Sequence, residues 1–308
     1  MRTARIATAI ALFFQWFIVV TGATVRLTGS GLGCPNWPTC TTTRAIPEFS
    51  FHPMVEFLNR MTATPTSIAA LVALWVGWRV AGGPRRDLRW ATSLVVFGIA
   101  VQAALGAFTV ILELPPEIVG SHFFVSILLL TAATFAWVAA GSDSALQLAR
   151  GRARSIVHIG SAVMLVALLG VIIAGVLTTA SGPHSGASGT GEVVDRFGIF
   201  SLAVTLHARG AYVFLVIAIG LTWLRRSTGR GPALRDFALL VVLVIAQIAL
   251  GEIQYRNGLP WGIVLAHVVN AALLWIVASR IAIDAVFSAH DDFIPHRDRP
   301  TRSRSHAR

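Results

Sequence analysis

Residues 246–267, AQIALGEIQYRNGLPWGIVLAH, repeat the pattern of residues 101–122, VQAALGAFTVILELPPEIVGSH. Each segment has a Gln at its second position, an Ala-Leu-Gly shortly after it, and a His at its last position. The matching residues keep one constant offset of 145 positions along the chain. A shared offset across a loop indicates an internal duplication, so we expect the two halves of the chain to share one helical arrangement.

The composition is that of a membrane protein. Of the 308 residues, 55% are hydrophobic and only 13% are charged, whereas soluble domains have about 25% charged residues. Crossing a membrane takes about 20 apolar helical residues, and eight such runs occur, near 6–24, 54–78, 90–112, 118–140, 156–179, 198–223, 236–256 and 261–286. We therefore predict an all-α integral membrane protein with eight transmembrane helices in two pseudo-repeated four-helix bundles, residues 1–145 and 146–287.

The positive charge follows the connections between these spans. All 25 basic residues are arginines, and most lie at the termini or on alternate connections, at Arg2, Arg5, Arg79, Arg85, Arg86, Arg89, Arg150, Arg152, Arg154, Arg225, Arg226, Arg230, Arg235 and between Arg297 and Arg308. Cytoplasmic loops carry such an excess, so we expect a multi-pass protein of the cell membrane with both termini cytoplasmic. This placement explains the net charge of +11 without a nucleic-acid partner.

Two further segments are read from their composition. The first apolar run has no small-residue cleavage site, which is not typical of a signal peptide. Residues 288–308 form a polar, Arg-rich tail, which we expect to be disordered and held near anionic lipid headgroups.

Four polar residues are predicted to lie at one depth near the outer surface: Asn59, His122, His207 and His267. Asn59 in LNR occupies the place in the second span that His207 in LHAR occupies in the sixth. Two imidazoles on facing helices of a four-helix bundle can hold a heme iron axially, which is our interpretation of His207 and His267. The alternative is that each His only hydrogen bonds a neighbouring helix. Zinc would require further ligands nearby.

Five other polar residues in the spans are candidates for heme contacts or for hydrogen bonds between helices. Arg60 and Arg209 either pair with heme propionates or extend to lipid headgroups. Gln102 and Gln247 are predicted to hydrogen bond between helices. Glu56 shares a helix face with Asn59, where it either transfers protons beside a heme or stabilises the first turn of its helix.

The two cysteines, Cys34 and Cys40, lie in an outer connection with the sequence TGSGLGCPNWPTC, residues 28–40. A structural disulfide is the default expectation on the oxidising side of the membrane. A redox-active dithiol is the alternative, because exposed or strained disulfides exchange readily.

These motifs resemble those of the heme A synthase family: GATVRLTGSGLGCPNWPTC at 22–40, EFLNR at 56–60, SGPHSG at 181–186 and LHA at 206–208. The resemblance covers all eight spans. It implies two pseudo-repeated four-helix bundles that oxidise a methyl group of heme O to the formyl group of heme A for terminal oxidases. It further implies that His207 and His267 bind heme B and that the first half receives heme O, with His122 on its iron. Glu56 would be important for turnover, and Cys34 would pair with Cys40.

One residue departs from the family pattern, because the family commonly has a His where this chain has Asn59. Three readings follow: His122 holds the substrate iron alone, with Asn59 or water opposite; another residue such as His52 substitutes; or the activity differs. We favour the first, since a weak axial position still permits heme docking.

The expected reaction is two successive hydroxylations of heme O, with heme O synthase, terminal oxidase assembly factors and an unidentified electron donor as partners. The alternatives are a b-type cytochrome that only transfers electrons and a heme carrier.

Overall fold

The computed structural model describes residues 1–43, 46–79, 85–148, 156–187, 197–229 and 232–289. Within these ranges eight helices are long and apolar enough to cross a membrane, which confirms the predicted fold class. They are α1 (Arg2–Leu27), α2 (Phe51–Arg79), α3 (Arg86–Ile111), α4 (Pro116–Ala140), α5 (Ile156–Ser181), α6 (Phe200–Thr228), α7 (Leu234–Arg256) and α8 (Trp261–Val286).

Each predicted span corresponds to one helix, and the largest difference at a single end is at the C-terminal end of α6, predicted at residue 223 and found at Thr228. Hydropathy falls at Arg225 and Arg226, but the backbone remains helical to Thr228. Gly229 then adopts a left-handed φ of 67°, a conformation that glycine reaches without steric strain and that commonly ends helices. The apolar run marks the part of a helix that lies in lipid, while the capping residue marks the end of the helix.

A short strand pair was not predicted. Strand β1 (Leu146–Leu148) follows α4 and pairs antiparallel with β2 (Phe287–Ala289), which follows α8. Strand β2 includes the first two residues of the segment predicted to be disordered, and residues 290–308 lie outside the described residues, as do Arg150, Arg152, Arg154 and Arg230. The pairing joins the ends of two helices that belong to different halves.

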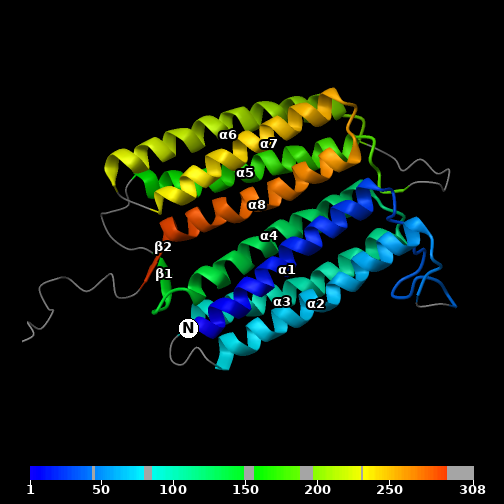
Figure 1. The fold of residues 1–308 in the computed structure, drawn as a ribbon, viewed down its shortest axis with the longest axis horizontal. Coiled ribbons are helices and arrows are strands. Elements are labelled where there is room, and N and C mark those ends of the chain that lie inside the picture. Colours follow the sequence, from blue (N-terminus) through cyan, green and yellow to red (C-terminus); the bar gives the residue numbers. More distant parts are fainter. Residues whose placement is uncertain (44–45, 80–84, 149–155, 188–196, 230–231, 290–308) are drawn as a thin grey trace, which may run out of the picture.

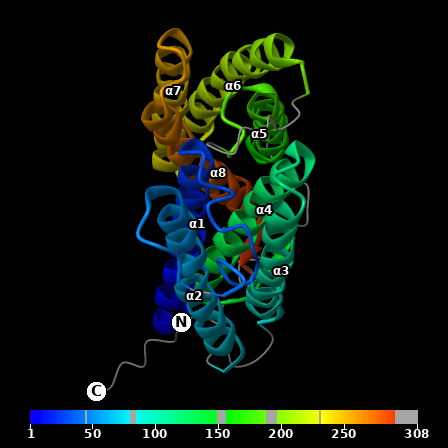
Figure 2. The same cartoon turned by 90° about the vertical axis from the view of Figure 1, so that its right-hand side faces the viewer.

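The helices form two adjacent groups, α1–α4 and α5–α8, with α1, α4 and α8 at the boundary between them (Figures 1 and 2). Buried residues of both groups share one apolar cluster, in which Val19 and Ile127 pack with Trp275 and other side chains of the second group. Trp275 on α8 donates its Nε1 hydrogen toward Ile127 O at 3.0 Å and Thr131 Oγ1 at 2.9 Å on α4. The two halves are therefore joined by apolar packing and by a directional indole contact.

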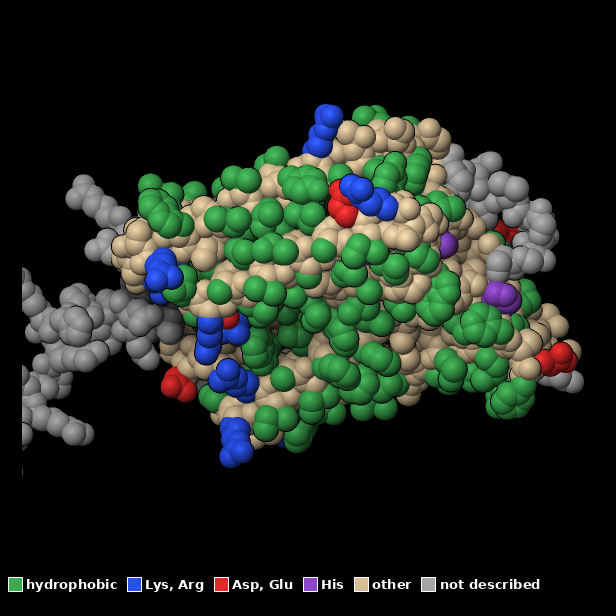
Figure 3. All heavy atoms as spheres, turned by 45° about the horizontal axis from the view of Figure 1, so that its top comes forward, with side chains coloured by type: hydrophobic (Ala, Val, Ile, Leu, Met, Phe, Trp, Pro, Cys, Tyr) green, Lys and Arg blue, Asp and Glu red, His purple; other side chains and the backbone are tan. Residues whose placement is uncertain are grey.

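The molecule has two polar ends and apolar sides. We call them the N-terminal end, which carries Met1 and the β1–β2 pair, and the disulfide end, which carries Cys34 and Cys40 (Figure 1). Apolar side chains cover much of the long sides (Figure 3), among them Trp75, Trp90, Val166, Val216 and Trp223. This is the distribution expected of side chains that face lipid.

At the N-terminal end, the buried Arg85 links α3 to α4. Its guanidinium pairs with Asp87 at 3.1 Å and donates to the carbonyl oxygens of Ala139 at 2.5 Å and Ser142 at 2.9 Å. These carbonyls lie at the end of α4, where the helix itself supplies no donors. Arg85 is thus a positively charged cap on another helix.

Replacing Trp275 with Phe should destabilise the contact between the halves, because the phenyl ring has no hydrogen-bond donor and leaves part of the buried indole volume empty. We expect a loss of at least about 0.5–1.5 kcal/mol, the usual contribution of such a hydrogen bond, measured as a lower temperature of thermal unfolding in detergent. Trp90→Phe is the matched control, since Trp90 is 75% exposed. Equal unfolding temperatures for the two variants would contradict this role of Trp275.

Candidate functional site

His207 on α6 and His267 on α8 face each other inside the second half. Their ring centres lie 6.0 Å apart and their planes cross at 65°. His207 Nδ1 lies 2.9 Å from the carbonyl oxygen of Val171, and since a carbonyl can only accept, Nδ1 carries the hydrogen. The other nitrogen, Nε2, is then left with a free lone pair. Metal-binding histidines are commonly oriented by such a bond to the backbone.

A glycine on a neighbouring helix lies against each of the four polar residues. A Cβ atom on these glycines would come 3.0 Å (Gly175 to His207), 3.4 Å (Gly251 to His267), 3.6 Å (Gly106 to His122) and 4.0 Å (Gly22 to Asn59) from the side chain. Each pair joins an odd-numbered helix to the helix that follows it. The same arrangement thus occurs four times, with Asn59 in the place of His207 and His122 in the place of His267.

The second-half pair fits a heme iron held from both sides. An imidazole nitrogen binds a transition metal at about 2 Å, so two opposed ligands would have ring centres about 6 Å apart. Among the described residues no three His, Cys, Asp or Glu side chains gather in one place, so no group resembles a structural zinc site. A heme supplies its own in-plane nitrogens and requires only one or two protein ligands.

Two buried ring nitrogens support the same interpretation. Nδ1 of His122 and Nδ1 of His267 have no hydrogen-bond partner among the described residues. The backbone of Gln247 interacts electrostatically with the His267 ring, but the geometry falls short of a hydrogen bond. Buried polar atoms without a hydrogen-bond partner are rare in folded proteins. Their presence at equivalent places in both halves is consistent with imidazole rings that bind a ligand.

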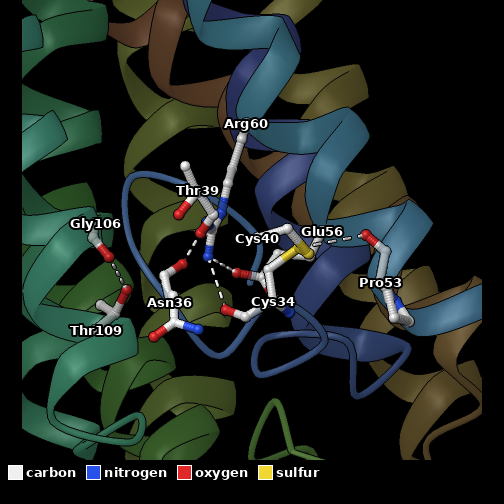
Figure 4. Close-up of polar contacts among 9 residues, drawn as sticks. All are labelled: Cys34, Asn36, Thr39, Cys40, Pro53, Glu56, Arg60, Gly106 and Thr109. Atoms are coloured by element: carbon white, nitrogen blue, oxygen red, sulfur yellow. Dashed lines mark hydrogen bonds and ion pairs between the residues drawn. A yellow bond between two sulfur atoms is a disulfide. The ribbon is translucent and has the colours of Figure 1, made fainter. Parts of the chain in front are cut away.

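Arg60 points away from the helix bundle and into the disulfide loop, residues 28–43 (Figure 4). Its guanidinium donates to the carbonyl oxygens of Cys34 at 3.0 Å, Asn36 at 2.8 Å and Thr39 at 3.3 Å, and it forms an ion pair with Glu56. In this structure the Arg60 guanidinium bonds the loop and Glu56. Its contact with a heme propionate stays a prediction. Arg209 lies exposed on α6.

Glu56 is the second anchor of this loop. Its side chain is only 5% exposed, and Oε2 accepts the backbone N–H of Cys34 at 2.7 Å while Oε1 pairs with Arg60. Cys34 and Cys40 form the expected disulfide and are both buried. Whether this bond takes part in redox chemistry stays a prediction.

Comparison with known proteins identifies the family. The family model COX15-CtaA, described as cytochrome oxidase assembly protein, matches residues 5–279. The chain belongs to this family. It is 29% identical over 138 residues to a heme A synthase of Bacillus pumilus, covering 42% of this chain and 45% of that protein. It is 33% identical over 138 residues to that of Bacillus licheniformis (42% and 44%) and 29% identical over 256 residues to that of Symbiobacterium thermophilum (76% and 80%). The chain thus spans less than half the length of the two Bacillus relatives that it matches.

Some contacts of this COX15-CtaA member agree with the sequence analysis. Gln102 donates to His122 O at 3.1 Å and to Ser126 Oγ at 2.5 Å, and Gln247 accepts from Asn270 at 2.6 Å. Both glutamines therefore bridge neighbouring helices, as predicted. Asn270 was missed, although it lies one turn beyond His267.

Loops of the two halves meet at the disulfide end, which the sequence did not predict. Gly31 N of the first half donates to Gly186 O of the second half at 2.8 Å. Within the second half, His184 Nε2 lies 2.9 Å from Leu259 O in the connection between α7 and α8. His52, considered as a substitute ligand, lies 3.0 Å from the hydroxyl of Ser30 in the loop. The only signal for this contact was the SGPHSG motif, residues 181–186.

Replacing Arg60 with Lys should loosen the disulfide loop. An ammonium keeps the charge but cannot reach three carbonyls and a carboxylate at once, and each hydrogen bond to a charged group contributes about 1.5–3 kcal/mol. We therefore expect a dilute dithiol to reduce the Cys34–Cys40 bond at least roughly tenfold faster in Arg60→Lys than in the unmodified protein. The rate is measured by alkylating the free thiols at intervals and counting them by mass spectrometry.

Arg256→Lys is the control for this measurement. Arg256 forms an ion pair with Glu252 at 3.0 Å on the same helix, and its side chain is 77% exposed. Its replacement should leave the reduction rate unchanged. An unchanged rate in Arg60→Lys would show that the loop is held by other contacts.

Proposed function

We propose that this protein is a heme A synthase, an oxidoreductase that converts a methyl group of heme O to the formyl group of heme A. The observation that carries the proposal is the unequal pair of sites on one repeated scaffold. The second half opposes His207 and His267 at 6.0 Å, whereas the first half has His122 and, at the position that corresponds to His207, the amide of Asn59. The names of the relatives and the family's description as cytochrome oxidase assembly proteins support it.

We assign heme B to the second half. His207 and His267 would hold its iron, and the bond from His207 Nδ1 to Val171 O fixes which nitrogen faces the metal. An iron with two histidine ligands has no open position, a ligand set suited to passing electrons. Heme B, when bound, would supply one-electron transfer between an unidentified donor and the first half.

Heme O would bind as the substrate in the first half, with His122 on its iron. Two successive hydroxylations each insert one oxygen atom into a C–H bond of the methyl group. The second product is a geminal diol, which loses water to give the formyl group. With dioxygen as the oxidant, each insertion also consumes two electrons and two protons, so the site needs a route for both.

Glu56 is the residue we propose to transfer protons in the first half. Both of its oxygens are engaged, by the Cys34 N–H and by Arg60. Taking up a proton therefore requires that one of these contacts weaken, which would loosen the disulfide loop. Arg209 is exposed on α6 two residues after His207. It is the arginine of the second half that we propose to pair with a heme propionate.

The surroundings are proposed from charge and family. Arginines concentrate at the N-terminal end, so we place that end in the cytoplasm and the disulfide end outside the cell membrane. Membrane lipids surround the apolar sides. Heme O synthase as the supplier of substrate and terminal oxidase assembly factors as recipients are the proposed partners.

The decisive experiment is the mass profile of hemes extracted from the protein, expressed with and without a heme O synthase in a host that makes no heme A. Heme A or its hydroxylated precursor, appearing only with the synthase, would support the proposal. Heme B alone in both cases would favour a b-type cytochrome, and unchanged heme O would favour a carrier.

A glycine substitution tests the assignment of heme B. In Gly175→Ala the new Cβ would lie 3.0 Å from the His207 ring, so the ring must move. Forcing atoms into a packed site costs about 1–3 kcal/mol, and we expect the heme B retained per polypeptide to fall at least severalfold, measured by pyridine hemochrome.

Gly170→Ala is the matched control, because it lies on the same helix and a Cβ there has no atom within 4 Å. It should retain heme B as the unmodified protein does. Equal heme content in both variants would remove His207 from the ligand set.

A further inference from the structure

Thr21, Asn59 and Thr62 form a hydrogen-bonded cluster between α1 and α2. Thr21 Oγ1 donates to the side-chain amide oxygen of Asn59 at 2.7 Å, and the Thr62 hydroxyl donates to the backbone carbonyl oxygen of Asn59 at 2.6 Å. The two hydroxyl oxygens lie 3.3 Å apart. The amide oxygen, which is the atom through which Asn binds cations, is thus engaged by a neighbouring helix. The NH₂ group that remains is a donor with no lone pair for a metal.

The second half differs at all three corresponding positions. Thr21 precedes Gly22 as Ala174 precedes Gly175, and Thr62 follows Asn59 by three residues as Gly210 follows His207. Ala174 and Gly210 line an apolar hollow between α5 and α6. The His207 ring binds the Val171 carbonyl there, since no hydroxyl is present.

These differences belong together. In the second half His207 lies beside small apolar residues. In the first half one hydroxyl, that of Thr21, bonds the Asn59 amide, and a second hydroxyl, that of Thr62, lies beside the first. The three first-half residues thus form one polar cluster where the second half has a histidine and two small residues.

We infer that Asn59 is a hydrogen-bond donor fixed opposite His122, and that the iron of a first-half heme has one protein ligand and one open axial position lined by this amide. The inference rests on the proposed function, which places a heme in the first half. Polarity and hydrogen-bond donors beside an open position decide whether a heme binds small molecules or only passes electrons. Thr21 is a positioning residue, because it acts by orienting the amide.

Carbon monoxide is the probe that separates the two sites. The full-length protein is loaded with heme B and with heme O without oxygen, its content of each heme is determined, and the ferrous form is titrated with carbon monoxide. An iron with two histidine ligands does not take up the gas readily, so we expect about one carbon monoxide for every two hemes. Asn59→His should supply the missing ligand and abolish this binding, and should convert the first-half heme to a low-spin spectrum.

The C–O stretching frequency tests the hydrogen bond itself. A donor beside bound carbon monoxide lowers this frequency, so Asn59→Leu and Thr21→Val should both raise it while binding is retained. Thr24→Val is the matched control, because the Thr24 hydroxyl bonds only within its own helix, to Val20 O at 3.0 Å. This measurement decides the inference even if Asn59→His fails to take up the first-half heme.

Each outcome has one meaning. A doubly loaded protein that binds no carbon monoxide, or an Asn59→His variant that binds it unchanged, overturns the open position. Equal frequencies in all variants overturn the hydrogen-bonding role of Asn59. Failure of the proposed function is seen separately, as a protein that binds heme B through His267 but takes up no heme O.

Discussion

Polar side chains inside this bundle must find partners in the protein or in a ligand, because the surrounding hydrocarbon offers none. Many hydroxyls bond the backbone of their own helix, as Thr134 does to Leu130 O, and other side chains bridge helices, as Trp275 does to α4. The ring nitrogens of His122 and His267 are among the buried atoms that have no partner within the described residues. These two lie at equivalent places in the two halves, which agrees with the heme sites proposed above.

One helical arrangement occurs in both halves and carries two different sets of side chains. The glycine contacts to the four polar residues occur in both halves, so the helices approach closely at all four places. What changed are the side chains around them, with His207 beside small residues in one half and Asn59 beside hydroxyls in the other. Two unequal sites on one scaffold would give the proposed enzyme a physical basis for separating electron supply from oxidation of the substrate.

The disulfide loop is connected to this layer through a single turn of helix. Glu56 and Arg60 hold the loop backbone, and Asn59 lies between them in the sequence. A change in the ion pair or in the loop would therefore be felt at the first-half site. On the other side, Gly31 joins the loop to Gly186 of the second half, so loops of both halves are in contact at the disulfide end.

The sequence by itself determined the eight spans, the internal repeat, the layer of histidines and the cysteine pair. These features can be recognised from periodicity, composition and spacing along one segment at a time. Segments that face lipid must be apolar, so the spans are visible in the hydropathy of the chain. Only the tertiary structure decided that Arg60 turns into the loop, that Thr21 holds Asn59 across 38 residues, and that β1 pairs with β2. Such partners depend on the rotation and relative height of neighbouring helices, and these are set by side-chain packing between segments that are distant in the sequence.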